Sequence, residues 1–337
     1  MYAEVGAAGR VTRVDRGLAS VLTADGLVRA SFGADLLEAM LVDTLAAPCA
    51  GDWCVVRQWP DGPVTVEVVL PRRTAVTRAE ASRRSRGQVL AANVDIVGVV
   101  VALQPEPHMG RLERLLSVAW DSGADPLVVL TKADIVTDAA LLADDITRVA
   151  PGVDVVTTST VTGEGLDELL ARVDGHRTLA LLGSSGHGKS SLTNALVGAD
   201  VLATKGIRAD GRGRHTTVRR ELVLLPTGGA VIDTPGLRGI GLLDTGEGLA
   251  AAFPDLAELA MRCRFSDCSH RSEPDCAVLA AVAGGELTVR RLSSWRLLQR
   301  EQLRMAARTD ARLRSELARG HKHLTKQARA AARARRP

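Results

Sequence analysis

Hydrophobic and polar residues follow three different patterns along the chain, and the first covers residues 1–85. Short apolar runs alternate there with turn signals such as Asp25-Gly26, Gly51-Asp52 and Asp61-Gly62. This pattern is typical of short β-strands, which we predict at 9–14, 18–23, 27–32, 53–58 and 64–70. Five short strands in this length indicate a small β-barrel, with the oligonucleotide-binding (OB) fold as the leading candidate.

The second pattern begins at residue 94, where apolar strands alternate with amphipathic helices. Strands are predicted at 94–103, 127–130, 153–157, 179–182 and 230–232, and helices at 111–121, 138–149, 165–173 and 190–196. Such alternation predicts a mainly parallel sheet flanked by helices. An arginine-rich connector precedes it, and its composition fits both a solvated linker and a loop in contact with phosphates. Its arginines are Arg72, Arg73, Arg78, Arg83, Arg84 and Arg86.

The third pattern, after residue 241, is helical and is interrupted by a compact Cys/His cluster. A helix is predicted at about 286–307, and a basic tail closes the chain. We therefore predict a multidomain protein with an N-terminal OB-fold barrel (1–85), a central α/β domain (86–242) and a mainly helical C-terminal domain (243–337).

A glycine-rich loop follows the strand at 179–182 and precedes a helix. Its spacing, G-x-x-x-x-G-K-S, lets several N–H groups point at one phosphate chain, with the helix N-terminus adding partial positive charge. In this interpretation Lys189 stabilises charge on the γ-phosphate, and the Ser190 hydroxyl holds Mg²⁺. The alternative is an ordinary glycine-rich turn. The predicted nucleotide-binding residues here are Gly183, Ser184, Ser185, Gly186, His187, Gly188, Lys189, Ser190 and Ser191, and His187 is given no chemistry of its own.

Two further segments are predicted to contact the phosphates. Asp233-Thr234-Pro235-Gly236 ends an apolar strand, so Asp233 can hold Mg²⁺ through water and the Gly236 N–H can meet the γ-phosphate. Upstream, the Gly-rich segment 211–217 ends in His215-Thr216-Thr217, and the hydroxyl of either Thr216 or Thr217 can complete the Mg²⁺ shell.

Two loops at strand ends are predicted to recognise the base. In Thr131-Lys132-Ala133-Asp134, a carboxylate can accept both N1–H and N2–H of guanine, which adenine does not offer. The loop Ser159-Thr160 can place a backbone N–H on guanine O6. The Lys132/Asp134 pair therefore favours GTP and GDP over the ATP of a P-loop kinase or ATPase.

The order of these motifs is unusual, because Lys132 and Asp134 precede Gly183 in the chain. In ordinary GTPases the phosphate loop comes first. Joining the old termini and cutting elsewhere preserves the spatial site, so the central domain is predicted to be a circularly permuted GTPase. The segment after Gly236 then leads directly into the C-terminal domain, to which it can transmit nucleotide-dependent motion.

The Cys/His cluster offers three thiolates and one imidazole within fourteen residues: Cys263, Cys268, His270 and Cys276. Four protein ligands complete a tetrahedral Zn²⁺ shell, so one structural zinc ion is predicted. A disulfide, which is rare in the cytosol, and scattered buried thiols are the alternatives. Cys49 and Cys54 are interpreted as barrel core.

The composition and the charge distribution indicate which class of partner the protein binds. Hydrophobic residues make up 46% of the 337 residues. Aromatic residues make up only 2%, and this low content argues against base stacking as the main mode of binding. Residues 308–337 contain ten Lys or Arg against Asp310 and Glu316, a net +8 within a total of +4, so the remainder carries about −4. Such a tail suits a polyanion. No apolar run has the length of a membrane span and no signal segment opens the chain, so a cytoplasmic protein is expected.

Together these features resemble the bacterial ribosome small-subunit-dependent GTPase family, called RsgA or YjeQ. The resemblance covers essentially the whole chain. The motifs on which it rests are Gly51-Asp52-Trp53, Asn93-Val94-Asp95, residues 183–192, 211–217 and 233–238, and the Cys/His pattern. It implies a late assembly factor that binds the 30S subunit and its 16S rRNA near the decoding region, hydrolyses GTP faster there, and leaves the mature subunit. A monomer without membrane or DNA partners is expected.

Four residues depart from the patterns of GTPases or of this family. Thr131 stands where most GTPases have Asn, and Ser184 and His187 stand where the family more often has Gln and Val; little effect is expected from the last two. Leu237 occupies the place of a water-orienting Gln, so intrinsic turnover should be slow.

The 30S subunit is expected to complete the site. In one hypothesis it orders His215 for catalysis. In the alternative, His215 only contacts RNA or packs against the switch segment. A GTPase for another ribosomal particle and a GTP-dependent RNA-binding module without turnover are the alternatives for the whole protein.

Overall fold

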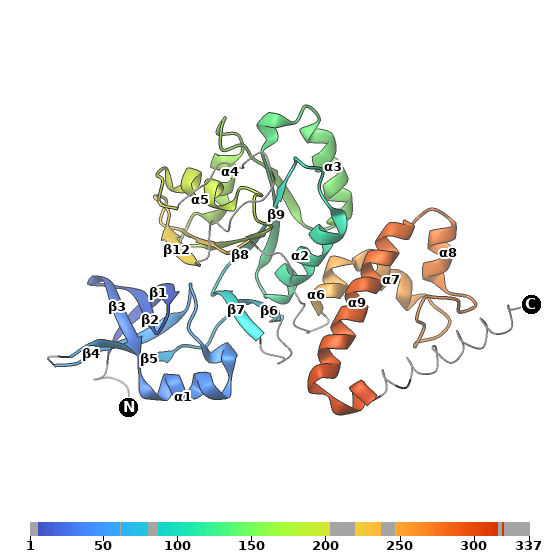
Figure 1. The fold of residues 1–337 in the computed structure, drawn as a ribbon. Coiled ribbons are helices and arrows are strands. Elements are labelled where there is room, and N and C mark those ends of the chain that lie inside the picture. The colour runs from blue at the N-terminus through green and yellow to red at the C-terminus, as the bar shows by residue number, and fades with distance from the viewer. Residues whose placement is uncertain are drawn as a thin grey trace, which may run out of the picture.

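The computed structural model describes residues 6–60, 62–79, 87–202, 220–236 and 247–315, together with residue 319. Three parts follow one another along the chain: a barrel, an α/β part and a helical part (Figure 1). Among the helices described, none combines the length and the hydrophobicity that crossing a membrane requires.

The N-terminal part is the predicted five-stranded barrel. Its strands run in the order β1-β2-β3-β5-β4, and pairing of β1 with β4 closes the barrel. Helix α1 (Ala34–Val42) and the 3-10 turn η1 (Thr44–Ala46) lie between the third and fourth strands. The strands are β1 (Ala7–Asp15), β2 (Leu18–Thr23), β3 (Gly26–Phe32), β4 (Trp53–Gln58) and β5 (Val64–Val69).

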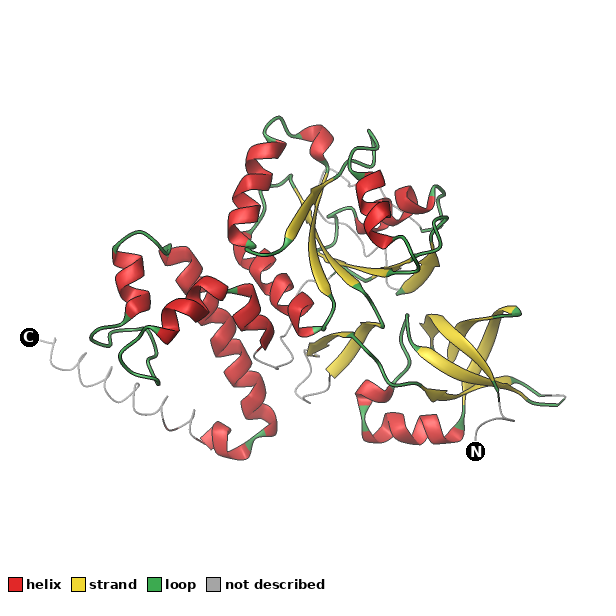
Figure 2. Cartoon of the chain, turned by 180° about the vertical axis from the view of Figure 1, so that it is seen from behind, coloured by secondary structure: helices red, strands yellow, loops and turns green. Residues whose placement is uncertain are grey.

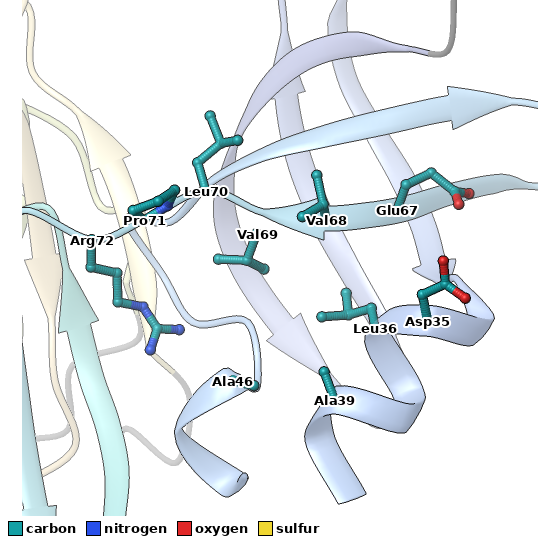
Figure 3. A pocket seen from close by; sticks show the side chains of 10 residues that line it. All are labelled: Asp35, Leu36, Ala39, Ala46, Glu67, Val68, Val69, Leu70, Pro71 and Arg72. Atoms are coloured by element: carbon teal, nitrogen blue, oxygen red, sulfur yellow. The ribbon is translucent and has the colours of Figure 1, made fainter. Parts of the chain in front are cut away.

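The hydrophobic pattern between β3 and β4 predicts no helix, so α1 is an addition to the expected barrel. Helix α1 is weakly amphipathic, because Leu36 is its one buried residue while Leu41 and Val42 are more than 80% exposed. A cavity of about 350 Å³ lies between α1 and β5, with Asp35 and Glu67 towards one end and Arg72 towards the other (Figure 3). Cys54 is buried in the barrel core, as predicted. Cys49 is also buried, but it packs with Val89 and Ala92 in a separate small cluster outside the barrel core.

The arginine-rich connector is neither a simple linker nor, at Arg72, a phosphate-binding loop. Arg72 makes a bidentate ion pair with the fully buried Asp52, at 2.7 and 2.8 Å. Strands β6 (Ala75–Ala79) and β7 (Gly87–Ala92) form a hairpin here, which lies between the barrel and the α/β part (Figure 1). Arg83, Arg84 and Arg86 lie outside the described residues.

The α/β part contains the predicted sheet, in the order β10-β9-β8-β11-β13-β12. Its strands are parallel except β12, which also pairs with β1 of the barrel. The first predicted strand, 94–103, is shorter than expected. The strands are β8 (Ile96–Ala102), β9 (Asp125–Thr131), β10 (Asp154–Thr157), β11 (Thr178–Gly183), β12 (Glu221–Leu224) and β13 (Ala230–Asp233).

Helices cover both faces of this sheet (Figure 2). Alternate side chains of each strand face opposite ways, so Val99 and Val128 pack with Leu112 of α2, whereas Val100 and Leu179 pack on the other face. The helices of this part are α2 (Met109–Asp121), α3 (Ala139–Val149), α4 (Leu166–Val173) and α5 (Lys189–Val197), with a 3-10 turn η2 (Ala133–Ile135).

The C-terminal part is helical, as predicted, and packs against α2. Glu113 of α2 is completely buried and accepts hydrogen bonds from Arg290 and Arg291, each at 3.1 Å. Arg291 also binds Asp255 and lies over the Phe253 ring, 4.7 Å from its centroid. The helices are α6 (Glu247–Ala252), α7 (Pro254–Met261), α8 (Ala277–Ala283) and α9 (Val289–Thr309).

Candidate nucleotide and metal sites

The predicted nucleotide residues of the described chain gather at one edge of the sheet. Parallel strands β8, β9, β10, β11 and β13 all end at this edge, the usual place for ligands in an open α/β sheet. Along the chain, the base loops after β9 and β10 precede the phosphate loop after β11. The sheet therefore has the permuted order that the sequence predicts.

The predicted phosphate loop, residues 183–191, runs from the end of β11 into the start of α5 by a tight backbone path. Gly186 and Gly188 both have φ of +85°, which favours glycine. A Cβ on Gly183 would lie 2.5 Å from the Val100 carbonyl oxygen. The Lys189 ammonium is buried and donates to the carbonyls of Gly183 and Ser184, at 3.0 and 3.1 Å. Burial lowers its pKa, and the Asp233 charge opposes that shift.

Ser190 and Asp233, the two described residues predicted to hold Mg²⁺, are in direct contact. The Ser190 hydroxyl donates to Asp233 Oδ2 at 2.6 Å. The other carboxylate oxygen, Oδ1, is buried and has no hydrogen-bond partner among the described residues. Burial raises the pKa of Asp233, while the Ser190 hydrogen bond and the Lys189 charge oppose this. A buried carboxylate oxygen without a partner beside a hydroxyl is a fitting donor set for Mg²⁺, which prefers oxygen ligands.

Gly236 brings the segment after β13 against the phosphate loop. A Cβ at Gly236 would lie 2.7 Å from both the Cα and the backbone nitrogen of Ser185, so a side chain would displace one of the two segments. Thr234 fixes the approach by donating to the Leu181 carbonyl at 2.6 Å. His215, Thr216, Thr217 and Leu237 lie outside the described residues.

The predicted base loops are organised by hydroxyl groups. Ser159 donates to Asp134 Oδ1 at 2.6 Å, which orients the carboxylate predicted to accept from guanine. Thr131 donates to the His187 carbonyl at 2.8 Å and so joins the base loop to the phosphate loop. Lys132 adopts a left-handed conformation, φ +64°, and Ala133 is buried behind it. The side-chain roles of Ser159 and Thr131 were not anticipated from the sequence.

Thr160 and Ser191 line one cavity, although they come from different loops. This cavity measures about 370 Å³ and lies beside the C-terminal end of α5, where Asn194 and Gly198 also line it. The two residues thus share a polar recess along α5. Their predicted contacts with nucleotide stay predictions.

Two contacts of the phosphate loop went unrecognised in the sequence. Arg111 at the start of α2 donates to the Ser184 hydroxyl at 2.9 Å. The His187 imidazole lies on the end of β8. No local sequence signal connects Arg111 to a residue 73 positions away. The departures at Ser184 and His187 were the available hint, because polar side chains in a loop that works through its backbone need partners of their own.

The second candidate site is the Cys/His cluster, which the structure brings together completely. The ligand atoms of Cys263, Cys268, His270 and Cys276 all lie within 4.8 Å of one another. His270 Nδ1 is 3.5 Å from the sulfurs of Cys263 and Cys276, which are 3.9 Å apart. That sulfur separation excludes a disulfide between these two, whose length would be about 2.05 Å, and Cys268 is also a free thiol. It matches the edge of a tetrahedron with Zn–S bonds of about 2.3 Å, about 3.8 Å.

Neighbouring residues hold this cluster in shape. The Glu273 carboxylate accepts from the hydroxyl and backbone N–H of Ser269 and from the N–H of Arg271 and Ser272. These hydrogen bonds, the Ser269 hydroxyl foremost, lower the pKa of Glu273. The His270 ring packs against Trp295 of α9, with centroids 5.5 Å apart. The cluster therefore links the loop between α7 and α8 to the long helix α9.

Comparison with known proteins identifies a family. A sequence profile described as RsgA GTPase matches residues 69–243. The "Small ribosomal subunit biogenesis GTPase RsgA" of Streptomyces coelicolor is 53% identical over 319 residues, 93% of this chain and 85% of that protein. The protein of the same name in Streptomyces avermitilis is 50% identical over 98% of this chain and 88% of that protein. The crystal structure of YjeQ from Thermotoga maritima superposes with a TM-score of 0.64 at 26% identity, covering 88% of this chain and 98% of that one.

Proposed function

The chain belongs to the RsgA GTPase family and is a GTP hydrolase, and from this premise we propose that it acts in the late maturation of the small ribosomal subunit. The observation that carries the proposal is the joint presence, in one chain, of the closed barrel, the permuted nucleotide edge and the Cys₃His cluster. The name shared by the two Streptomyces relatives supports the choice of the small subunit. The three domains are proposed at 1–85, 86–242 and 243–337, in a cytoplasmic monomer.

In the proposed nucleotide site each side chain has one task. Lys189 neutralises charge on the β- and γ-phosphates, while N–H groups of the loop 183–191 hold the phosphate chain. Asp134, oriented by Ser159, accepts from guanine. Ser190 and Asp233, with Thr216 or Thr217, would hold Mg²⁺, which supplies charge stabilisation on the phosphate oxygens when bound. The Gly236 N–H faces the γ-phosphate.

Intrinsic hydrolysis by this site is proposed to be slow. Leu237 directly follows Gly236, and an apolar side chain does not orient an attacking water. The 30S subunit would complete the site, with His215 as the candidate that it orders. The competing proposal leaves His215 in contact with RNA or packed against the switch segment.

The Cys₃His cluster is proposed to hold one structural zinc ion. Four protein ligands fill the tetrahedral shell, which leaves no open position for a substrate. The ion would fix the loop between α7 and α8 to α9 through His270 and Trp295. Zinc would therefore stabilise the C-terminal part and take no part in hydrolysis.

RNA is the proposed contact surface on the subunit, specifically 16S rRNA. Support comes from α9, where Arg300, Arg304 and Arg308 recur at every fourth position and are exposed. None of the three pairs with a carboxylate of the described residues, whereas the exposed Arg148 and the half-buried Arg172 and Arg177 all do. A row of unpaired cations about 6 Å apart along a helix fits a phosphate backbone.

GTP turnover by the purified protein alone, with 30S subunits and with 50S subunits tests the proposal. Strong stimulation by 30S subunits only is the expected result. Stimulation by 50S subunits instead would assign the protein to the other particle. Tight GTP binding without stimulated turnover would favour an RNA-binding module.

A further inference from the structure

His187 is the one residue in the phosphate loop with a large side chain between two glycines. Gly186 and Gly188 flank it, and both have left-handed backbone conformations. A backbone with glycine on both sides is loosely constrained, because glycine has the widest choice of φ and ψ. Lys189 and Arg111 hold the first part of the loop, at Gly183 and Ser184, so the contacts that His187 itself makes matter most between the two glycines.

The imidazole makes such a contact with the end of strand β8. Its Nδ1 lies 3.1 Å from the Val100 carbonyl oxygen and 3.4 Å from the Ala102 backbone nitrogen. In a parallel ladder, a carbonyl of one residue and the N–H two residues later point to the same neighbouring strand. β11 pairs with β8 up to Gly183 opposite Val100 and then turns into the phosphate loop. Nδ1 thus occupies the position that the next backbone group of β11 would have filled.

The backbone carbonyl of the same residue is held by a second strand. Thr131, the last residue of β9, donates its hydroxyl to the His187 carbonyl at 2.8 Å. A Cβ at the adjacent Gly188 would lie 3.5 Å from the Thr131 hydroxyl oxygen, so the two loops are in close contact there. His187 is therefore anchored to β8 by its side chain and to β9 by its main chain.

We propose that His187 is a positioning residue of the nucleotide site: its Nδ1–H, bound to the Val100 carbonyl, fixes the phosphate loop in the shape that binds the phosphates. The side chain does not touch the nucleotide in this arrangement. It acts through the backbone N–H groups on either side, which must point inward together to hold a phosphate chain. The proposal departs from the expectation that His187 has no chemistry of its own and that its difference from Val has little effect, and it rests on the proposed nucleotide site.

An anchored loop binds nucleotide more tightly than a loose one, because less conformational freedom is lost on binding. One hydrogen bond of this kind changes an equilibrium constant by about fivefold to tenfold. Because phosphate binding in the ground state and in the transition state depends on the same loop, the change should appear mainly in the GDP dissociation constant and in KM for GTP. The turnover number should change less.

Three variants of the full-length protein separate the hydrogen bond from the bulk of the side chain. His187→Val removes the donor, and His187→Gln places its amide near Nε2 rather than Nδ1. His187→Asn restores an N–H donor where Nδ1 stood. The matched control is His176→Gly: His176 Nδ1 lies 3.1 Å from the Gly228 carbonyl, at the other end of β11. Glycine suits the φ of +72° there.

GDP affinity, KM and kcat for GTP, and the melting temperature without nucleotide are measured for each protein. We expect His187→Val and His187→Gln to bind GDP about fivefold to tenfold more weakly, with His187→Asn and His176→Gly within twofold of the parent. Equal GDP affinity in His187→Val or His187→Gln, or a loss in His187→Asn as large as in either, would overturn the inference. A parent protein that binds neither GDP nor GTP would instead refute the proposed nucleotide site.

Discussion

Arg111 and Ser184 are 73 positions apart in the chain, and the Arg111 guanidinium donates to the Ser184 hydroxyl at 2.9 Å. This contact joins the first turn of α2 to the phosphate loop. The same helix binds α9 through Glu113 and through an ion pair between Arg114 and Glu301 at 2.7 Å. One helix therefore touches both the phosphate loop and the C-terminal part.

Replacing Arg111 should weaken nucleotide binding modestly. Arg111→Met keeps most of the aliphatic stem and removes the donor to Ser184, so the GDP dissociation constant should rise about threefold, at the low end for a hydrogen bond because Arg111 is exposed. Titration with fluorescent GDP measures the change. Arg148→Met, on the exposed face of α3, is the control. An unchanged dissociation constant in Arg111→Met would mean that the contact does not order the loop.

Replacing Glu113 should destabilise the fold strongly. Glu113→Ala leaves the buried Arg291 with Asp255 as its remaining carboxylate, and breaking a buried ion pair from one side costs about 3 kcal/mol. Urea unfolding followed by circular dichroism measures the loss. The control Glu168→Ala breaks an exposed pair with Arg172 and should cost less than about 1 kcal/mol. Similar losses in both variants would show that burial does not set the strength of this link.

The sequence predicted the fold and the Cys/His cluster better than the contacts that hold the predicted sites in place. Barrel strands, sheet strands and the Cys/His ligands carry local signals, such as apolar runs, turn residues and ligand spacing. The hydroxyl of Ser159 on Asp134 and that of Thr131 on the His187 carbonyl carry none, because each joins segments that only the folded sheet brings together. Helix α1 escaped prediction since one buried leucine gives too little periodicity.

The two interpretations of the arginine-rich connector, as a solvated linker or as a loop in contact with phosphates, missed the structure at Arg72 for a related reason. A cluster of arginines in sequence indicates positive charge, but it says nothing about where the matching carboxylate lies. Asp52, twenty positions before Arg72, neutralises that arginine inside the structure. Arg78 instead donates to Gln88 on the neighbouring strand. Charge clusters therefore predict a surface only where no distant partner is folded against them.

Folding stability should depend on the protonation of His187. Burial lowers the pKa of its imidazole below the usual value of about 6.5, chiefly by desolvation, with the Lys189 and Arg111 charges adding to the shift. The unfolded chain then binds a proton that the folded chain does not, so the free energy of unfolding falls as the pH drops below about 6.5. Urea unfolding at pH 5 to 8 should show a shallower decline for His187→Asn. Parallel curves would contradict the shifted pKa.

The zinc content of the protein should depend on the cysteines of the Cys/His cluster and not on those of the barrel part. The purified protein should contain one zinc per chain, Cys276→Ala should contain none, and Cys54→Ala, altered in the barrel core, should retain it. Atomic absorption measures this. Chelation should lower the melting temperature of the C-terminal part but spare basal GTP turnover, because the nucleotide residues lie at the sheet edge. Loss of turnover together with zinc would argue against a purely structural ion.

The arginine row on α9 should contribute to RNA binding through phosphate contacts. Removing three such contacts lowers the slope of log affinity against log salt by about 2 to 3, so the triple variant Arg300→Gln, Arg304→Gln, Arg308→Gln should bind 30S subunits more weakly and with a shallower salt dependence. The triple variant of Arg148, Arg172 and Arg177 to Gln removes the same charge from sites that are already ion-paired. It should keep a slope close to that of the parent, because net charge alone makes no phosphate contact. Equal slopes for the two triple variants would assign the effect to overall charge and remove α9 from the interface.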